Sequence, residues 1–228
     1  MQMNDMLVSL LEQRRSVRGF LSDPVPIGIM RQIFATAQMA PSNCNVQPWV
    51  VHTVSGEKAE QMRRELEQAA RERDETRPDF PLTLAYPDVY RTRQIEAAKA
   101  LFSATGVERS DKVAREASFI RNFRFFDAPH VAFLFLPQWA GWREAADAGI
   151  YAQTLMLSLT ANGLASCSQG ALGHHADVVR RVLGLKEDLK LLFGIAFGFE
   201  DPEHPANNVR TVRAPIEENH FFHGSAVG

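Results

Sequence analysis

The sequence predicts an α+β fold with a mostly antiparallel central sheet flanked by helices. Stretches typical of strands and of helices are mixed along the 228 residues, without the regular βαβ alternation that builds a parallel sheet. No G-x-G-x-x-G fingerprint follows a strand and no Walker A loop occurs, because the glycines of GLASCSQGALG have the wrong spacing for either. We therefore expect no Rossmann-type site, and residues 1–228 are expected to form a single domain around one core.

Four short apolar stretches have the character of strands. WVVHTV and HVAFLFLP are rich in the β-branched and aromatic residues that pack well on a sheet. LASCSQGAL is expected to be a short strand running into a turn, and LLFGIAFGF another buried strand. The four stretches are residues 49–54, 130–137, 164–172 and 191–199.

Apolar side chains at helical spacing predict the helices that flank these strands. Near the start, Asn4 or Asp5 can cap a first helix whose leucines share one face. A second helix follows Pro26, a long apolar helix spans residues 145–163, and an amphipathic helix spans residues 175–184. Because residues 145–163 are apolar nearly all round, we expect that helix to lie centrally.

Two segments contain few residues that suit a core. Residues 57–124 hold 13 acidic and 14 basic side chains, more than half of the chain's 25 basic residues, and such mixed-sign density is typical of exposed helices. We expect this segment to be a helical excursion from the core, near the mouth of an active site. Residues 200–228 include Pro202, Pro205 and Pro215, which exclude a helix of any length, so they are expected to form a C-terminal arm.

The composition limits the expected partners and location. The formal net charge is −2, so no overall field would attract nucleic acid or an acidic membrane, and no apolar run approaches the ~20 residues that span a bilayer. The first residues carry their charge after the apolar positions and lack a small-residue cleavage site, unlike a signal peptide. With only two cysteines, Cys44 and Cys167, the expected compartment is the reducing cytoplasm.

Neither a metal centre nor a catalytic side chain is expected. His174 and His175 have no carboxylate or thiolate cluster near them in the sequence, so we expect them at the surface or in a helix cap. Cys44 and Cys167 have no partner of the Cys-His type, and both are expected to pack against neighbours. Phe123, Phe125 and Phe126 are expected in the core next to a strand. The alternative is that one of the three lies at the edge of a substrate pocket.

Three arginines fall within five positions of RRSVRGF, residues 14–20. If the chain is extended there, Arg14, Ser16 and Arg18 point one way, while Arg15 and Val17 point the other. Two guanidinium forks and a hydroxyl on one face suit a phosphate or another anionic group. A solvated charge patch is the alternative that this segment alone leaves open.

Two further segments carry polar residues with a similar pair of interpretations. In APSNCNVQPW four donors and acceptors fall within six positions: Ser42, Asn43, Asn45 and Gln47. They could read the edge of a heterocycle, or they could cap a turn that leads into a strand. In NNVRTVRAP, Arg210 and Arg213 could bind an anion or form an ordinary surface pair.

Together these segments resemble the nitroreductase family, whose members are flavin mononucleotide (FMN) flavoproteins. RRSVRGF, the APSNCNVQPW loop before a strand, GLASCSQGALG after a long apolar helix, and FGFEDPEHPANNVRTVRAP near the end occur in the family's order. The strand opening FFDAPHVAFLF fits as well, so the resemblance spans about residues 7–217. The segment ATGVERSDKVAREA is similar to the nitrobenzoate-reductase-like branch.

The resemblance implies how FMN would be held. Its phosphate and ribityl chain would contact Arg14, Arg15 and Ser16, with Arg213 as a second phosphate ligand and Arg210 as a further candidate. Arg18 matches a basic position beside N1 and O2 of the flavin ring, where a fixed cation stabilises the negative charge of the reduced form.

Two more segments match the surroundings of the flavin ring in the family. A loop that lines the flavin, partly from the neighbouring subunit, corresponds to Pro41, Ser42, Asn43, Asn45 and Gln47. The strand end that passes the ring near N5 corresponds to Ser168, Gln169 and Gly170. There a backbone N–H can bond N5, and a glycine lets the backbone come close.

The resemblance implies an FMN-dependent oxidoreductase that works as a homodimer, with the C-terminal arm swapped onto the partner subunit. NADH or NADPH would pass a hydride to FMN and leave, and a small electron-poor acceptor such as a nitroaromatic would enter the same slot, which is ping-pong transfer. The cofactor carries the chemistry, so no side chain need act as a nucleophile. Another reaction on the same fold (dehalogenation, flavin cleavage or ene-type reduction), a flavin-sequestering protein and a phosphate-binding module without flavin are the alternatives.

Overall fold

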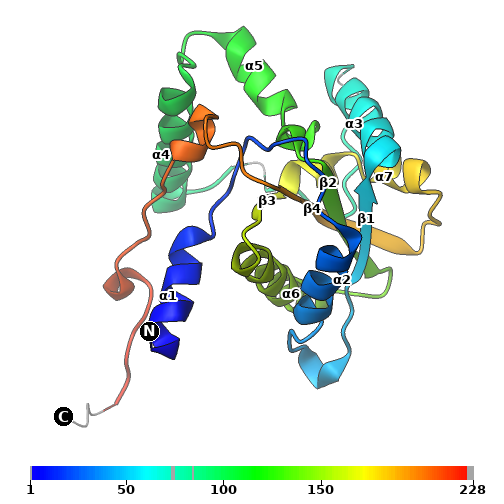
Figure 1. The fold of residues 1–228 in the computed structure, drawn as a ribbon. Coiled ribbons are helices and arrows are strands. Elements are labelled where there is room, and N and C mark those ends of the chain that lie inside the picture. Colours follow the sequence, from blue (N-terminus) through cyan, green and yellow to red (C-terminus); the bar gives the residue numbers. More distant parts are fainter. Residues whose placement is uncertain (1, 73–74, 84, 225–228) are drawn as a thin grey trace.

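Figure 1 shows the fold in a computed structural model, which describes residues 2–72, 75–83 and 85–224. Within these residues, one sheet of antiparallel strands has the order β1–β2–β4–β3. The strands are β1 (Val50–Ser55), β2 (His130–Pro137), β3 (Ala165–Gln169) and β4 (Leu189–Gly198). The predicted α+β fold is confirmed, and its sheet is built from the four stretches that the sequence singled out.

The α-helices that the described residues form are α1 (Met3–Gln13), α2 (Ile27–Ala37), α3 (Gly56–Arg71), α4 (Asp88–Thr105), α5 (Lys112–Ile120), α6 (Trp142–Ala161) and α7 (Ala176–Leu183). Short 3₁₀ turns are η1 (Asn43–Asn45), η2 (Phe125–Asp127), η3 (Gly170–His174), η4 (Pro205–Asn208) and η5 (Ile216–Glu218). The cap of α1 differs from the predicted one, because Gln2 holds the cap position and its N–H donates to Asp5 Oδ2 at 3.1 Å.

Helices cover both faces of the sheet (Figure 1). On one face α2 and α6 pack against Ala132, Leu134 and Leu136 of β2. On the other face α3 and α7 pack against the alternate residues of the same strand, such as Phe133 and Phe135. Because successive side chains of a strand point to opposite faces, β2 is buried on both sides, and it forms the centre of the core.

Helix α6 is central, as predicted, but it is not buried all round. Tyr151, Leu155 and Leu159 enter the core, whereas Ile150 on the same helix is 43% exposed. Helix α6 therefore has one face in the core and an apolar side chain exposed on another.

The segment 57–124 divides into two parts. Its first part is the core helix α3, whose Ala59, Met62 and Leu66 are buried against the sheet, so the prediction of an excursion is wrong there. Because α3 is rich in charged residues, its composition predicted an exposed helix although these apolar residues form a buried stripe. Helix α4, in contrast, has no buried residue and lies away from the sheet in Figure 1. Residues 73 and 74 lie outside the described part.

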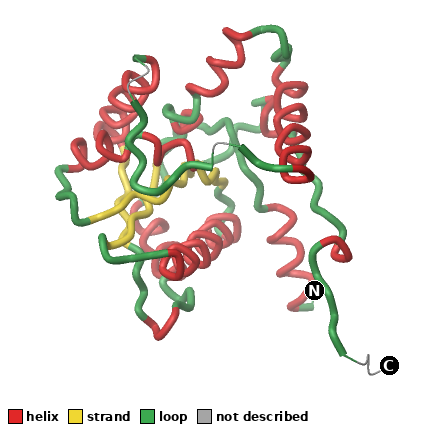
Figure 2. Tube along the Cα trace, turned by 180° about the vertical axis from the view of Figure 1, so that it is seen from behind, coloured by secondary structure: helices red, strands yellow, loops and turns green. Residues whose placement is uncertain are grey.

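Helix α1, helix α4 and the C-terminal arm lie together on one side of the molecule (Figures 1 and 2). The arm runs along α4 of its own chain, where Arg93 Nη2 pairs with Glu218 Oε2 at 2.6 Å. Helix α1 buries no residue, and its apolar side chains are open to solvent. At the end of the arm Phe221 is 67% and Phe222 84% exposed.

The remaining expectations from the sequence have mixed outcomes. Cys167 is buried as expected, but Cys44 is exposed in the loop before β1, so the expectation that it packs in the core is wrong. His175 is at the N-cap of α7 and buried against the ring of Phe123, with centroids 5.4 Å apart. Phe123, Phe125 and Phe126 are core residues. None of the described helices is long and apolar enough to cross a membrane.

Candidate functional site

The segment after α1 runs beside the free edge of β3. The N–H of Val17 donates to the carbonyl of Ser166 at 3.1 Å, and the N–H of Leu21 donates to Phe199 at 2.9 Å. The side chain of Val17 is buried in the core, whereas that of Ser16 remains exposed. Ser16 and Val17 therefore point in opposite directions, as expected for an extended segment.

The chain returns to this segment nearly two hundred residues later. The buried side chain of Asn207 accepts from the N–H of Arg18 at 2.7 Å and donates to the carbonyl of Gly19 at 2.9 Å. A Cβ on Gly19 would lie 2.2 Å from Cγ of His204, so only glycine fits this crossing. The asparagine lies within the motif that drew attention to Arg210 and Arg213, but its clamping role was not foreseen.

A pocket of about 660 Å³ opens where the two segments meet. Five arginines and one serine of the predicted set line it: Arg14, Arg15, Ser16, Arg18, Arg210 and Arg213. Glu12 is the one carboxylate among its lining residues. The volume falls in the range of small-molecule sites, and the charge favours an anion.

Two arginines of this pocket repel each other and have no acidic partner among the described residues. Burial first, and then the charge of Arg213, lowers the pKa of Arg14. Arg14 pairs with no carboxylate among the described residues, and Arg213 donates only to its neighbours Thr211 and Val212. A phosphate group between the two guanidinium groups would relieve their repulsion and accept several charge-assisted hydrogen bonds, so the residues present fit the phosphate of FMN.

Among the other three arginines of the pocket, one has an acidic partner in the described part of the chain. Arg15 forms an ion pair with Glu200, whereas Arg18 Nη1 donates to the carbonyl of Ser16 at 3.2 Å and Arg210 Nη1 donates to the carbonyls of Asn207 at 2.8 Å and Val209 at 3.1 Å. A cation that is already paired has less to gain from an incoming anion. Arg14 and Arg213 also lack a carboxylate partner among the described residues, and because the charge of Arg213 disfavours that of Arg14, this pair gains the most from an incoming anion.

The loop before β1 lies outside this pocket. None of Pro41, Ser42, Asn43, Asn45 and Gln47 lines it, and all of them except the half-buried Ser42 are exposed. Gln47 N–H donates to Ser42 Oγ at 2.9 Å, and its side-chain amide donates to Asn45 at 3.1 Å. Asn45 (φ 56) and Gln47 (φ 50) adopt left-handed conformations, so the loop is shaped by its own hydrogen bonds into one defined form.

The end of β3 also lies outside the arginine pocket. Ser168 is exposed, while Gln169 is buried and donates its side-chain amide to the carbonyl of Asn122 at 2.8 Å. A Cβ on Gly170 would meet nothing within 4 Å in this chain. Gly170 borders a second cavity, of about 440 Å³, whose wall includes Tyr86. In a single chain the eight predicted residues of the loop and of this strand end therefore do not join the six arginine-pocket residues.

Fold and site together define an α+β protein with an arginine-lined pocket at the edge of an antiparallel sheet. The sequence model of the Nitroreductase family matches residues 11–199, and this chain belongs to that family. Nitroreductase NfnB of Mycolicibacterium smegmatis is 42% identical over 93% of this chain and 91% of its own length. A 4-nitrobenzoate reductase of Nocardioides sp. is 29% identical over 94% and 88%, respectively.

The fold of the chain also matches a solved structure closely. The crystal structure of the FMN-dependent nitroreductase NfnB from Mycobacterium smegmatis, in complex with NADPH, superposes with a TM-score of 0.93 at 40% identity. The match covers 98% of this chain and 100% of that one. It therefore extends beyond the sheet to the helices and the arm.

Proposed function

We propose that this protein is an FMN-dependent NAD(P)H nitroreductase that works as a homodimer. The observation that carries the proposal is the pair Arg14 and Arg213, two mutually repelling guanidinium groups that pair with no carboxylate of the described residues and line the same pocket. The likeness to NfnB, a protein described as FMN-dependent and crystallised with NADPH, supports the choice of cofactor and electron donor.

When bound, FMN would supply the redox chemistry of a ping-pong cycle whose electron donor is NADH or NADPH and whose acceptor is a small electron-poor aromatic such as a nitroaromatic. Arg14 and Arg213 would hold the phosphate, with Ser16, Arg15 and Arg210 around it. Arg18 would keep a positive charge beside the flavin ring, which would favour the added negative charge of the reduced form. Asn207 accepts the N–H of Arg18 and so fixes the backbone from which the Arg18 side chain extends.

The dimer supplies what one chain lacks. We infer that the loop residues Pro41, Ser42, Asn43, Asn45 and Gln47 reach the flavin of the partner subunit, while Ser168, Gln169 and Gly170 pass the ring of their own. The exposed apolar side chains of α1 and the open face of α6 support a partner at this side of the molecule. The C-terminal arm is proposed to cross onto the partner, where Phe221 and Phe222 gain cover. Residues 1–228 form one domain in this proposal.

Two further parts of the proposal come from composition. A cytoplasmic location rests on the low cysteine count, and the absence of nucleic-acid and membrane partners rests on the net charge of −2. The competing functions are a flavin-sequestering protein and another reaction on the same fold.

The decisive experiment uses the FMN-loaded full chain under anaerobic conditions. Loss of the flavin absorbance on adding NADPH or NADH, followed by its return on adding nitrobenzene or 4-nitrobenzoate, is the expected result. Tightly bound FMN that neither nicotinamide reduces would show a flavin-sequestering protein. Failure to take up FMN at all would show that the arginine pocket serves another anion.

A further inference from the structure

A turn of unusual backbone conformation lies close to Arg18. Phe125, Phe126 and Asp127 are consecutive non-glycine residues with φ values of 58°, 54° and 67°. L-residues rarely adopt the left-handed region, and three in a row persist only where surrounding contacts hold them. Strain of this kind gathers at functional sites, so the contacts of the turn indicate what it serves.

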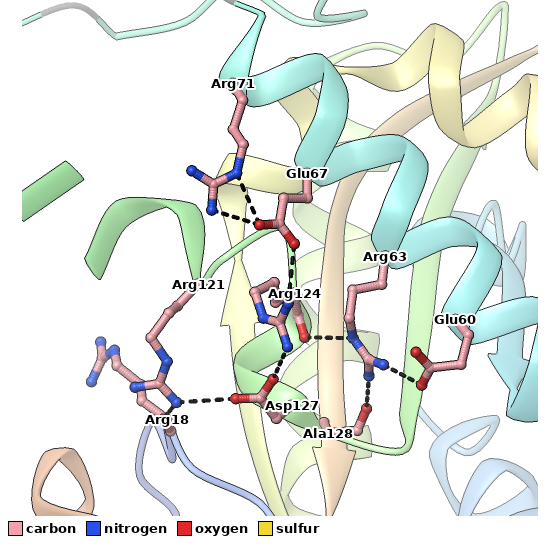
Figure 3. A network of polar contacts seen from close by, with 9 residues as sticks. All are labelled: Arg18, Glu60, Arg63, Glu67, Arg71, Arg121, Arg124, Asp127 and Ala128. Atoms are coloured by element: carbon pink, nitrogen blue, oxygen red, sulfur yellow. Dashed lines mark hydrogen bonds and ion pairs between the residues drawn. The ribbon is translucent and has the colours of Figure 1, made fainter. Parts of the chain in front are cut away.

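Helix α3 fastens the turn from one side. The guanidinium of Arg63, which is 9% exposed, donates to the carbonyl of Arg124 at 3.1 Å and to the carbonyl of Ala128 at 2.9 Å (Figure 3). These two carbonyls flank the turn on either side. Arg63 also lies over the ring of Phe125, 5.6 Å from its centroid, and pairs with Glu60.

The other side of the turn faces Arg18. The ring of Phe126 lies 6.0 Å from the guanidinium carbon of Arg18 and 5.7 Å from that of Arg121. Arg121 Nη2 donates to the carbonyl of Arg18 at 2.9 Å, and the same nitrogen lies 3.5 Å from Asp127 Oδ2 (Figure 3). The carbonyl of Arg18 thus accepts from Arg121, while its guanidinium lies over the ring of Phe126 and donates to the carbonyl of Ser16 at 3.2 Å.

On its other side Asp127 belongs to a network of ion pairs that does not include Arg18. Asp127 Oδ1 accepts from Arg124 at 3.1 Å, and Arg124 donates to Glu67 at 3.1 Å (Figure 3). Glu67 belongs to the same network as Asp127, but it contacts neither Arg121 nor Arg18. It is therefore the natural control for the charge of Asp127.

We propose that Phe126, Arg121 and Asp127 are positioning residues that set the guanidinium of Arg18 and thereby the redox potential of the bound flavin. This inference rests on the proposed function, in which Arg18 lies beside the flavin ring. In this proposal the turn Phe125–Asp127 connects α5 to β2 and also fixes the position of the Arg18 guanidinium.

The sign of one substitution separates positioning from simple electrostatics. Asp127→Asn removes a negative charge, which by itself would favour reduction of the flavin and raise its midpoint potential. Loosening Arg121, and with it Arg18, withdraws a positive charge from the ring and lowers the potential. Asparagine tolerates the left-handed conformation at least as well as aspartate, so the backbone of the turn is kept.

The experiment measures midpoint potentials of FMN-loaded wild type and variants by equilibration with a reference dye. Arg18→Gln is the reference and is expected to lower the potential. Asp127→Asn and Phe126→Leu are expected to lower it as well, by up to a tenfold loss of preference for the reduced form, or about 30 mV for a two-electron couple. Glu67→Gln and Phe125→Leu are the matched controls and are expected not to lower it.

Each outcome bears on the proposal separately. A potential that rises or stays constant in Asp127→Asn, while Arg18→Gln lowers it, overturns the positioning role and leaves the proposed function standing. An equal fall in the control Phe125→Leu shows that general loosening of the turn is responsible, and it also overturns the role. If Arg18→Gln leaves the potential unchanged in a loaded protein, the place assigned to Arg18 is wrong. A protein that does not take up FMN refutes the proposed function itself.

Discussion

The backbone N–H of Asn43 donates to both carboxylate oxygens of Asp147, at 3.2 Å to Oδ1 and 3.1 Å to Oδ2. Asp147 is 7% exposed and lies in the first half of α6, so one buried carboxylate joins the loop of residues 41–47 to the central helix. If that loop lines the flavin of the partner, Asp147 governs the affinity of a site that it does not touch.

Substitution of Asp147 tests this connection. Asp147→Ala leaves the N–H of Asn43 without its acceptor, and losing a hydrogen bond to a charged group costs about 1.5–3 kcal/mol. We expect FMN binding to weaken at least tenfold, measured by quenching of flavin fluorescence, while the arginine pocket stays intact. Asp147→Asn keeps one acceptor and should weaken binding less. Equal affinities in wild type and Asp147→Ala would show that the loop plays no part in binding.

The phosphate site is tested by Arg14→Ala and Arg213→Ala. Each removes one fork from a dianion, which should cost about 2 kcal/mol or more, roughly 30-fold in the dissociation constant for FMN. Because the two guanidinium groups repel each other, neither substitution should lower the melting temperature of the FMN-free protein. Arg143→Ala, an exposed arginine on α6 outside the pocket, is the control. Wild-type affinity in both pocket variants would disprove the phosphate assignment.

We expect the buried His130 to make the folded protein less stable at acidic pH. Its Nε2 accepts the N–H of Val25 at 2.8 Å, its Nδ1 lies 2.6 Å from Ser55 Oγ, and burial lowers its pKa. A histidine whose folded pKa is depressed binds fewer protons in the folded than in the unfolded chain. Its contribution is therefore fully present above the unfolded pKa of about 6.5 and is lost as the pH falls below it.

The free energy of unfolding, measured in urea between pH 8 and pH 5, should therefore fall with pH, and His130→Gln should flatten that slope. His52, His174 and His204 also have pKa values lowered by burial, so part of the slope should remain. The exposed His220 serves as the control, since His220→Gln should keep the wild-type slope. A slope unchanged in His130→Gln would assign the acid sensitivity to other groups.

Truncation after Ala214 tests the arm. It removes Ile216, Phe221 and Phe222, whose apolar surface is exposed in the single chain, together with the pair Arg93–Glu218. We expect the dimer and FMN affinity to weaken together, as seen by sedimentation and by flavin titration, because a partner that completes a site is linked to its ligand. Truncation after His223 is the control. A shortened protein that remains dimeric and binds FMN normally would refute the proposed swap.

The sequence was most informative where a pattern is local. The strands and the helices α2, α6 and α7 follow from the periodicity of their apolar side chains, and Gly184 ends α7 in a left-handed conformation (φ 66). Helix α3 was misjudged because its high charge density masks the stripe Ala59, Met62 and Leu66. Composition over a long window cannot distinguish an exposed helix from an amphipathic core helix.

The site could be predicted only in part for a related reason. The arginines of RRSVRGF and NNVRTVRAP are visible as clusters, and the fold brings them together. The contacts that fix them come from residues far away in the sequence: Asn207 reaches Arg18 across 189 positions, and Arg121 reaches it across 103. Contacts between residues so far apart in the sequence cannot be predicted from local residue spacing. The loop 41–47 and the strand end 168–170 do not join the arginine pocket within one chain, and their place beside the flavin remains part of the proposed dimer.

The meeting of residues 14–18 with residues 207–213 has a consequence for biosynthesis. At about 5–20 residues per second, a ribosome needs on the order of ten to forty seconds to proceed from Arg18 to Arg213. Until Arg213 has been synthesised, the first cluster lacks this opposing cation, so the nascent chain contains no complete phosphate site. If FMN binds as proposed, it is therefore loaded only after translation has passed Arg213.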